Sequence, residues 1–374
     1  MKRIQLASFD WRGTGLRIVG VLIALALAAG IGAVILAVTG QSPVDAYSGI
    51  LQGSFGTAND FQATLALTTP LILSGLAFVV AFRSGVFNAG TQGQLVMGAF
   101  GASVAGSAPE LASLPPIIHF VVILLVAMVF GAAWSLPPIL MKIAWGTSEI
   151  LTSLMLTYVA ALLNDYLVQG PFRAKHLQPG ANSQTEPFSA SAHFPVLIPG
   201  TQVTVMLIIG IVLAVGIWLF FRRTTLGFKM VFFGKSPDAV RAAGISSKRV
   251  LITAMLGSGA VAGLAGAAIA GGVFQADITP FPADVGFNGV LAALLVNGSP
   301  MLVPFSSLLF GALAQGGLGL QVFGGISQYI ASVLTATIIL FAAPKSVPEG
   351  LKRLSRRLFA RRSTEQTEME AKSL

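Results

Sequence analysis

Apolar stretches of about 20 residues recur along the chain, separated by short segments that hold most of its charges. A stretch of this length lets a helix cross the hydrocarbon core of a bilayer. The composition agrees, because 54% of the 374 residues are hydrophobic, 10% are charged and the mean hydropathy is +0.81. Backbone groups inside lipid must bond within the chain, as they do in helices. We therefore expect an all-α, polytopic membrane protein.

Nine of the stretches are long enough to span, and a tenth is too short. The long stretches are 16–38, 63–82, 87–106, 117–141, 149–168, 201–221, 251–273, 302–320 and 326–343. The tenth, 285–297, predicts a broken or re-entrant helix. We expect about ten crossings in one transmembrane domain, 1–343, followed by a basic tail, 344–374.

Two polar intervals lie between these stretches on the expected external side. Residues 41–60 predict a polar connection, and 169–200 predict a loop with little regular structure because they contain five prolines. The glycine-rich run in 251–273 places small residues three and four apart, which predicts close helix packing.

The basic residues fix the expected orientation. With the amino terminus in the cytoplasm, 21 of the 23 Lys and Arg fall on the cytoplasmic side, and only Arg173 and Lys175 lie outside. An even number of crossings places both termini in the cytoplasm. The net charge of +9 is concentrated beside apolar spans, which indicates contact with membrane lipid and not with nucleic acid.

The long basic segment 222–250, which lies between two apolar spans, contains a short, well-delimited helix. Ser236 can cap it, Pro237 suits its first turn, Asp238 complements its positive end and Gly244 can close it in a left-handed conformation. A helix of about two turns is marginal alone in water, so a surface must hold it. One alternative remains, which is an ordinary solvated basic loop.

The run SPDAVRAAGISSKRV in this segment resembles the cytoplasmic coupling loop of ABC-importer permeases. The resemblance implies a helix that fits a groove on an ATP-binding subunit. It assigns this docking role to Ser236, Pro237, Asp238, Ala239, Arg241, Ala242, Ala243 and Gly244.

Two Phe-Asn segments, GVFNAGTQG at 85–93 and VGFNGVLAA at 285–293, suggest an internal inverted repeat. By the expected topology they enter the membrane from opposite sides, and broken helices of this kind line a solute passage at the repeat interface. The predicted passage residues are Phe87, Asn88, Gln92, Gln94, Phe287, Asn288 and Asn297. For each of them, helix packing is the alternative.

The run AFRSGVFNAGTQGQLVMGAF, followed by the coupling loop and GFNGVLAALLVNGSP, resembles permeases of simple-sugar and nucleoside ABC importers over about 65–315. This resemblance implies an inner-membrane permease with three partners. They are a cytoplasmic ATP-binding cassette subunit, a second identical or homologous permease, and a periplasmic or lipoprotein substrate-binding protein. ATP and Mg would bind the partner, so we expect no cofactor in this chain. A passage rich in amides suits a small neutral hydroxylated solute, and the resemblance favours a nucleoside or a simple sugar.

The sequence carries no sign of catalysis or of a metal site. It has no Cys, and its three His lack metal-ligand spacing. We therefore expect a non-catalytic subunit. The alternative function is an ion-coupled secondary transporter, for which Asp165 would be the best intramembrane acid.

Overall fold

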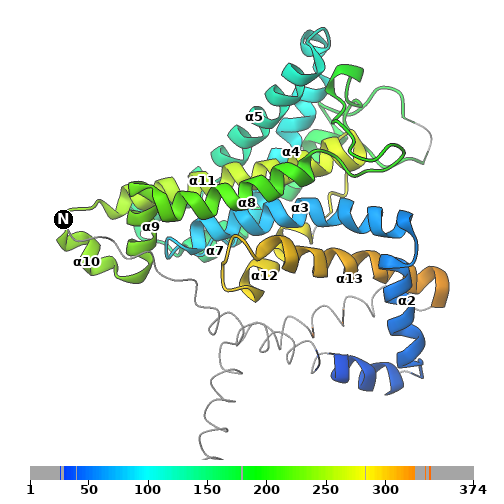
Figure 1. Ribbon diagram of the computed structural model, residues 1–374. Coiled ribbons are helices and arrows are strands. Elements are labelled where there is room, and N and C mark those ends of the chain that lie inside the picture. Colours follow the sequence, from blue (N-terminus) through cyan, green and yellow to red (C-terminus); the bar gives the residue numbers. More distant parts are fainter. Residues whose placement is uncertain are drawn as a thin grey trace, which may run out of the picture. The chain divides into compact units, whose positions relative to one another are not determined.

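The computed structural model describes residues 26, 29–38, 40–177, 180–282, 284–324, 333 and 337. It divides into two compact units, one formed by 1–44 and 332–374 and the other by 45–331. The second unit contains almost all the described residues (Figure 1). The predicted first span is described as a helix from Ala29 to Val38. The predicted last span and the tail lie outside the described residues, apart from two positions.

The described residues are helical with no extended strand, so the all-α prediction is confirmed. The longer helices are α2 (Pro43–Phe55), α3 (Ala58–Phe82), α4 (Thr91–Ser107), α5 (Pro116–Trp134), α6 (Leu136–Trp145), α7 (Glu149–Gln169), α8 (Met206–Arg223), α9 (Thr225–Lys235), α11 (Ser247–Ile269), α12 (Val285–Leu295) and α13 (Val303–Gly324). A six-residue helix, α10 (Pro237–Ala242), two 3₁₀ turns, η1 (Pro109–Leu111) and η2 (Ala190–Ala192), and a π-helical turn, η3 (Ala270–Phe274), complete the set.

Six helical stretches are long and apolar enough to cross a membrane. They are Ala58–Phe82, Pro116–Trp145, Glu149–Gln169, Met206–Arg223, Ser247–Phe274 and Val303–Leu320. Helix α4 has 17 residues, and α12, with 11, is too short to span, as the sequence predicts. A total of ten crossings remains a prediction.

The predicted polar connection at 41–60 is instead largely helical. Helix α2 occupies most of it, and α3 begins five residues before the predicted span. A capping box explains the early start: the Asp60 N–H donates to Thr57 Oγ1 at 3.2 Å, and the Thr57 N–H donates to Asp60 Oδ2 at 3.0 Å. Capping therefore extends a helix into a segment whose polarity suggested a loop.

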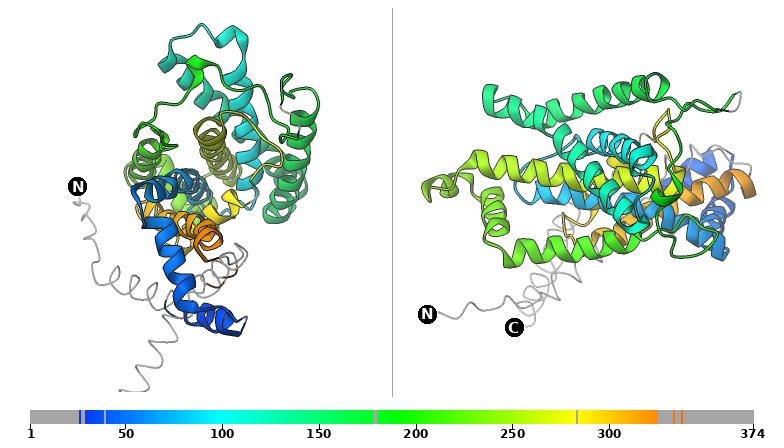
Figure 2. Two further views of the ribbon diagram at one scale, coloured as in Figure 1. Left: turned by 90° about the vertical axis from the view of Figure 1, so that its right-hand side faces the viewer. Right: turned by 90° about the horizontal axis from the view of Figure 1, so that it is seen from above.

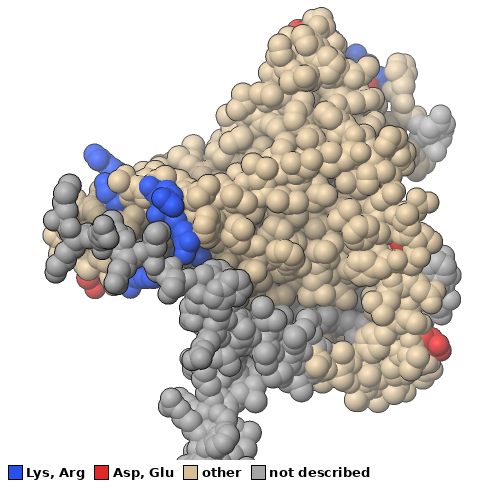
Figure 3. All heavy atoms as spheres, viewed as in Figure 1, with Lys and Arg blue, Asp and Glu red and all other residues tan. Residues whose placement is uncertain are grey.

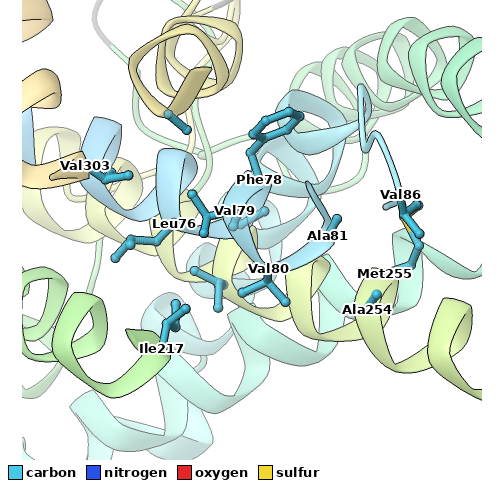
Figure 4. Packing of buried hydrophobic residues seen from close by; sticks show 14 of the residues in the cluster. Leu76, Phe78, Val79, Val80, Ala81, Val86, Ile217, Ala254, Met255 and Val303 are labelled. Carbon is cyan, nitrogen blue, oxygen red and sulfur yellow. The ribbon is translucent and has the colours of Figure 1, made fainter. Parts of the chain in front are cut away.

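Helix α11 lies at the centre of the second unit, packed against α3, α4 and α5 (Figure 2). Its glycines permit this, because a Cβ added to Gly263 would collide with the backbone of Ala127 in α5, and one added to Gly98 in α4 would collide with Gly263. Close backbone approach is what the glycine spacing predicts. Side chains of α3, α8, α11 and α13, including Leu76 and Ile217, fill the adjoining apolar core (Figure 4).

The outer faces of the helices suit lipid. Large apolar side chains such as Ile117, Leu162 and Val212 are exposed on α5, α7 and α8. On the face shown in Figure 3, Lys and Arg gather mainly at the end where α9 and α10 lie, and the wide surface between the ends is almost uncharged. This distribution supports the predicted orientation, with α10 in the cytoplasm.

The loop 170–205 at the opposite end is ordered by a second loop, 275–284. The Thr185 N–H donates to the Asp277 carbonyl at 2.9 Å, and the Thr279 N–H donates to the Ser183 carbonyl at 2.9 Å. Gln184 and Ile278 form an isolated antiparallel bridge. Prolines exclude longer strands here, so long-range pairing supplies the order that the local sequence lacks.

Candidate functional site

Helix α10 is held by its ends and by one side chain. The Val240 N–H donates to the Ser236 carbonyl at 3.1 Å, and the Ile245 N–H donates to the Val240 carbonyl at 3.1 Å. Gly244 has a φ of +73°, the left-handed conformation that the sequence predicts. Val240 is fully buried and anchors the helix to the protein.

The rest of the short helix faces outward. The exposed residues of the predicted docking set are Ser236, Pro237, Asp238, Ala239, Ala242, Ala243 and Gly244. Arg241 lies on the same helix. Because the exposed side chains of this short helix are small, a groove on a partner protein could fit closely around it.

Helix α9, which precedes α10, is absent from the sequence prediction. Its N-cap residue is Thr224, whose Oγ1 accepts a hydrogen bond from the Gly227 N–H at 3.0 Å. The signal was a Thr cap before an amphipathic run, which the basic residues of the segment obscured. Helix α9 connects the exposed α10 to the span α8.

The carboxyl end of α9 lies against the turn that follows α3. A Cβ added to Gly234 would lie 2.7 Å from both the Arg83 carbonyl oxygen and the Gly85 nitrogen. Gly85 has a φ of +74°, so glycine is required there by conformation as well as by space. The segment that carries α10 therefore touches the start of the first Phe-Asn loop directly.

Arg83 extends this junction to two further elements. Its Nε donates to the Gly298 carbonyl at 2.9 Å, in the turn between α12 and α13, and its guanidinium carbon lies 5.7 Å from the centroid of the Phe221 ring in α8. Burial, and secondarily the charge of Arg222, lowers the pKa of Arg83. The ends of α3, α8, α9 and α12 thus converge on one turn.

Asn88, a predicted passage residue, is fully buried and fully bonded. Its Nδ2 donates to Gln94 Oε1 and to Ser258 Oγ, both at 2.8 Å, and its Oδ1 accepts from the Gly90 N–H at 3.1 Å. Ser258 in turn donates to the Ala77 carbonyl at 2.7 Å. These bonds join the α3–α4 loop, α4, α11 and α3, which favours the helix-packing alternative for Asn88 and Gln94.

Gln92 brings the two Phe-Asn segments together. Its Nε2 donates to the Pro282 carbonyl at 2.9 Å, and its Oε1 accepts from the Gly286 N–H. The amino ends of α4 and α12 therefore meet inside the protein. This contact is compatible with the predicted inverted repeat, which remains a prediction.

The other predicted passage residues differ in their burial and in the contacts of their side chains. Phe87 packs edge-on against Phe78 with 5.0 Å between ring centroids. Phe287 and Asn288 are half-buried, and the Asn288 side chain makes no hydrogen bond within the described residues. Asn297 is exposed, with a φ of +52°, in the turn after α12. Asn288 is thus the predicted amide that remains available inside the protein.

The described residues hold no group of three or more His, Cys, Asp or Glu that could bind a metal ion. His119 is buried between α4 and the loop 170–205. Its Nε2 lies 3.0 Å from the Ala105 carbonyl oxygen, and its Nδ1 lies 2.9 Å from Ser191 Oγ. Both ring nitrogens of His119 thus have partners within the protein.

These features define a multi-pass helical membrane protein in which an exposed short helix is joined, through α9, to a turn where several long helices end. The chain belongs to the family described as the branched-chain amino acid transport system / permease component, which residues 61–343 match.

Curated relatives agree with this family over most of their length. The Nucleoside ABC transporter permease protein NupB of Lactococcus lactis is 34% identical over 88% of this chain and 91% of its own. The Guanosine ABC transporter permease protein NupP of Bacillus subtilis is 32% identical over 86% and 92%. The Glucose ABC transporter permease protein TsgB13 of Haloferax volcanii is 34% identical over 88% and 87%. The chain is accordingly a multi-pass inner-membrane permease of an ABC importer and not an enzyme.

Proposed function

We propose that this permease forms the passage for a small neutral hydroxylated solute, namely a nucleoside or a simple sugar. A partner subunit hydrolyses ATP to drive the import. The solutes named for the relatives, nucleosides, guanosine and glucose, are all neutral and carry several hydroxyls.

The contact between Gly234 and Gly85 carries the coupling part of the proposal. A cytoplasmic ATP-binding cassette subunit grips the exposed α10, and displacement of α10 moves α9. Since α9 touches the turn after α3, the movement reaches the loop in front of α4. ATP and Mg bind the partner, so the permease requires no cofactor of its own.

The remaining partners follow from the same scheme. A second permease, identical or homologous, completes the passage, and a periplasmic or lipoprotein binding protein delivers the solute to the end formed by the loops 170–205 and 275–284. The residues that serve the passage in this scheme are Asn288 and Phe287, with Phe87, Asn88, Gln92, Gln94 and Asn297 shaping it.

Reconstitution tests the proposal against ion coupling. Proteoliposomes that hold the permease, its ATPase and its binding protein should transport radiolabelled uridine, guanosine or glucose only when ATP and Mg are present on the side of the membrane where the ATPase lies. Accumulation driven by a proton or sodium gradient without ATP would contradict the proposal and favour the alternative function, an ion-coupled secondary transporter.

A further inference from the structure

Two buried polar side chains at the external end have no hydrogen-bond partner. Asn164 lies in α7, five residues before its end at Gln169, and Asp277 lies in the loop 275–284. Both are 0% exposed. All four of their side-chain nitrogen and oxygen atoms are unpartnered. Native proteins rarely leave such groups unpaired, so each such pair requires an explanation.

The two side chains face each other across this end of the protein. The Asn164 amide and the Ile278 N–H lie near enough to Asp277 to favour its charged form, although neither makes a hydrogen bond of acceptable geometry. Burial dominates and raises the pKa of Asp277 to about 7. The carboxyl and the amide therefore form one buried polar pair.

The neighbouring polar groups are already engaged with each other. Thr279 Oγ1 donates to Asp165 Oδ1, and the Asp277 backbone N–H donates to Thr185 Oγ1 at 3.0 Å. The Asn164 and Asp277 side chains, in contrast, have no hydrogen-bond partner among the described residues.

We infer that Asn164 and Asp277 form a binding site for a hydroxyl-bearing part of the transported solute. A hydroxyl is both donor and acceptor, so it can donate to an Asp277 oxygen and accept from Asn164 Nδ2 at once. Two adjacent hydroxyls, as in a ribose or a hexose, would use both carboxylate oxygens and the amide. The inference rests on the proposed function, because it assumes that the chain passes such a solute.

Other occupants fit the pair less well. A hard cation takes about six or more oxygen ligands, whereas this pair offers three oxygens and no cluster of three acids exists among the described residues. A buried water would satisfy part of the same capacity and would be displaced by a solute hydroxyl. The pair therefore points to a polyhydroxylated ligand.

The site is closed, and one loop covers it. Three backbone hydrogen bonds hold the loop 275–284 to the segment 183–188: Thr185 N–H to Asp277 at 2.9 Å, Thr279 N–H to Ser183 at 2.9 Å and Phe188 N–H to Gln275 at 2.8 Å. The same loop leads into α12 and is bonded to Gln92 at Pro282. A solute must part the loop from 183–188 to enter, and this movement reaches the amino end of α12.

Binding to the permease–ATPase complex in lipid nanodiscs tests the site without the binding protein. Uridine should raise the thermal unfolding temperature in a dose-dependent way, and 2′,3′-dideoxyuridine, which lacks the adjacent hydroxyls, should not. Asp277→Asn and Asn164→Leu should each weaken uridine binding about tenfold or more. Asp165→Asn is the matched control, since Asp165 is already bonded to Thr279, and it should leave uridine binding within about twofold.

A cross-link provides a second measurement in this cysteine-free chain. Gln184→Cys with Ile278→Cys should form a disulfide across the bridge, abolish uridine binding when oxidised and restore it when reduced. Equal binding of uridine and dideoxyuridine, unchanged affinity in Asp277→Asn, stabilisation by sodium chloride alone, or no stabilisation at all would overturn the inference. ATP-driven uptake through the binding protein, measured in parallel, tells whether the proposed function survives that failure.

Discussion

Gly234 at the end of α9 lies backbone to backbone with Gly85 in the turn after α3, so closely that a Cβ on Gly85 would be 2.7 Å from the Gly234 Cα. One residue pair thus connects the segment that carries the exposed helix α10 to the loop in front of α4. Neither glycine leaves room for another side chain, so the proposed coupling depends on a direct backbone contact at this point.

Gly234→Ala should uncouple ATP hydrolysis from transport. The added methyl must displace the backbone of Arg83 or Gly85, because both lie at 2.7 Å. We expect ATP-driven uptake to fall about tenfold while the ATPase still binds, measured as uptake per bound ATPase. Gly216→Ala in α8 is the control, since nothing lies within 4 Å of its added Cβ. Equal uptake in both variants would remove the contact from the coupling path.

Gly244→Val should weaken ATPase binding without preventing membrane insertion. The position has a φ of +73° and open space around it, so the cost comes from the backbone and should exceed about 1 kcal/mol. Gly244→Asn, which tolerates this conformation, should retain most of the binding. Pull-down of the ATPase with each variant checks this, and intact binding of the Val variant would contradict the docking role of α10.

Asn88→Leu and Asn288→Leu should fail in different ways. The first removes the buried partner of Gln94 and of the Gly90 N–H, at about 1 to 3 kcal/mol each, and one of the two bonds of Ser258, so the amount of folded protein should drop. The second removes no internal bond and should lower uptake while folding and ATPase recruitment persist. Size-exclusion profiles and uptake assays separate the two. Normal folding of Asn88→Leu with reduced uptake would restore Asn88 as a passage residue.

Stability should fall as pH rises because of Asp277. Its pKa in the folded protein is raised from 3.8 to about 7, mainly by burial and secondarily by the Asp165 carboxylate. The folded state therefore binds this proton more tightly than the unfolded chain, and the stabilisation present below pH 3.8 is lost as the pH rises to about 7. Thermal unfolding between pH 5 and about 8 should show this loss, and Asp277→Asn should flatten it. A flat wild-type profile would mean that Asp277 is not buried as described.

Hydropathy and local signals predicted much of this fold. The spans in α3, α7, α8, α11 and α13 follow from apolar length, and the ends of α10 follow from Pro237 and Gly244, whose effects act within a few residues. The chain's family also follows from its local motifs.

Long-range contacts could not be predicted from the sequence. The bond of Asn88 to Ser258, 170 residues away, favours a structural role for this amide, and no local pattern reports it. Asp277 reads as a loop acid, yet the loop 170–205 buries it. The contact of Gly234 with Gly85 is equally invisible, because each glycine alone resembles an ordinary turn residue.

Site-specific cross-linking of α10 to the ATPase tests the central claim most directly. The chain has no cysteine, and Ala239 is exposed on α10, so Ala239→Cys offers one defined attachment point. We predict a cross-link to a cysteine in the ATPase groove that forms in the assembled complex and whose closure blocks ATP-driven uptake until it is reduced. Uptake that continues with Ala239→Cys fully cross-linked, or a cross-link that forms only from the external face, would contradict the account.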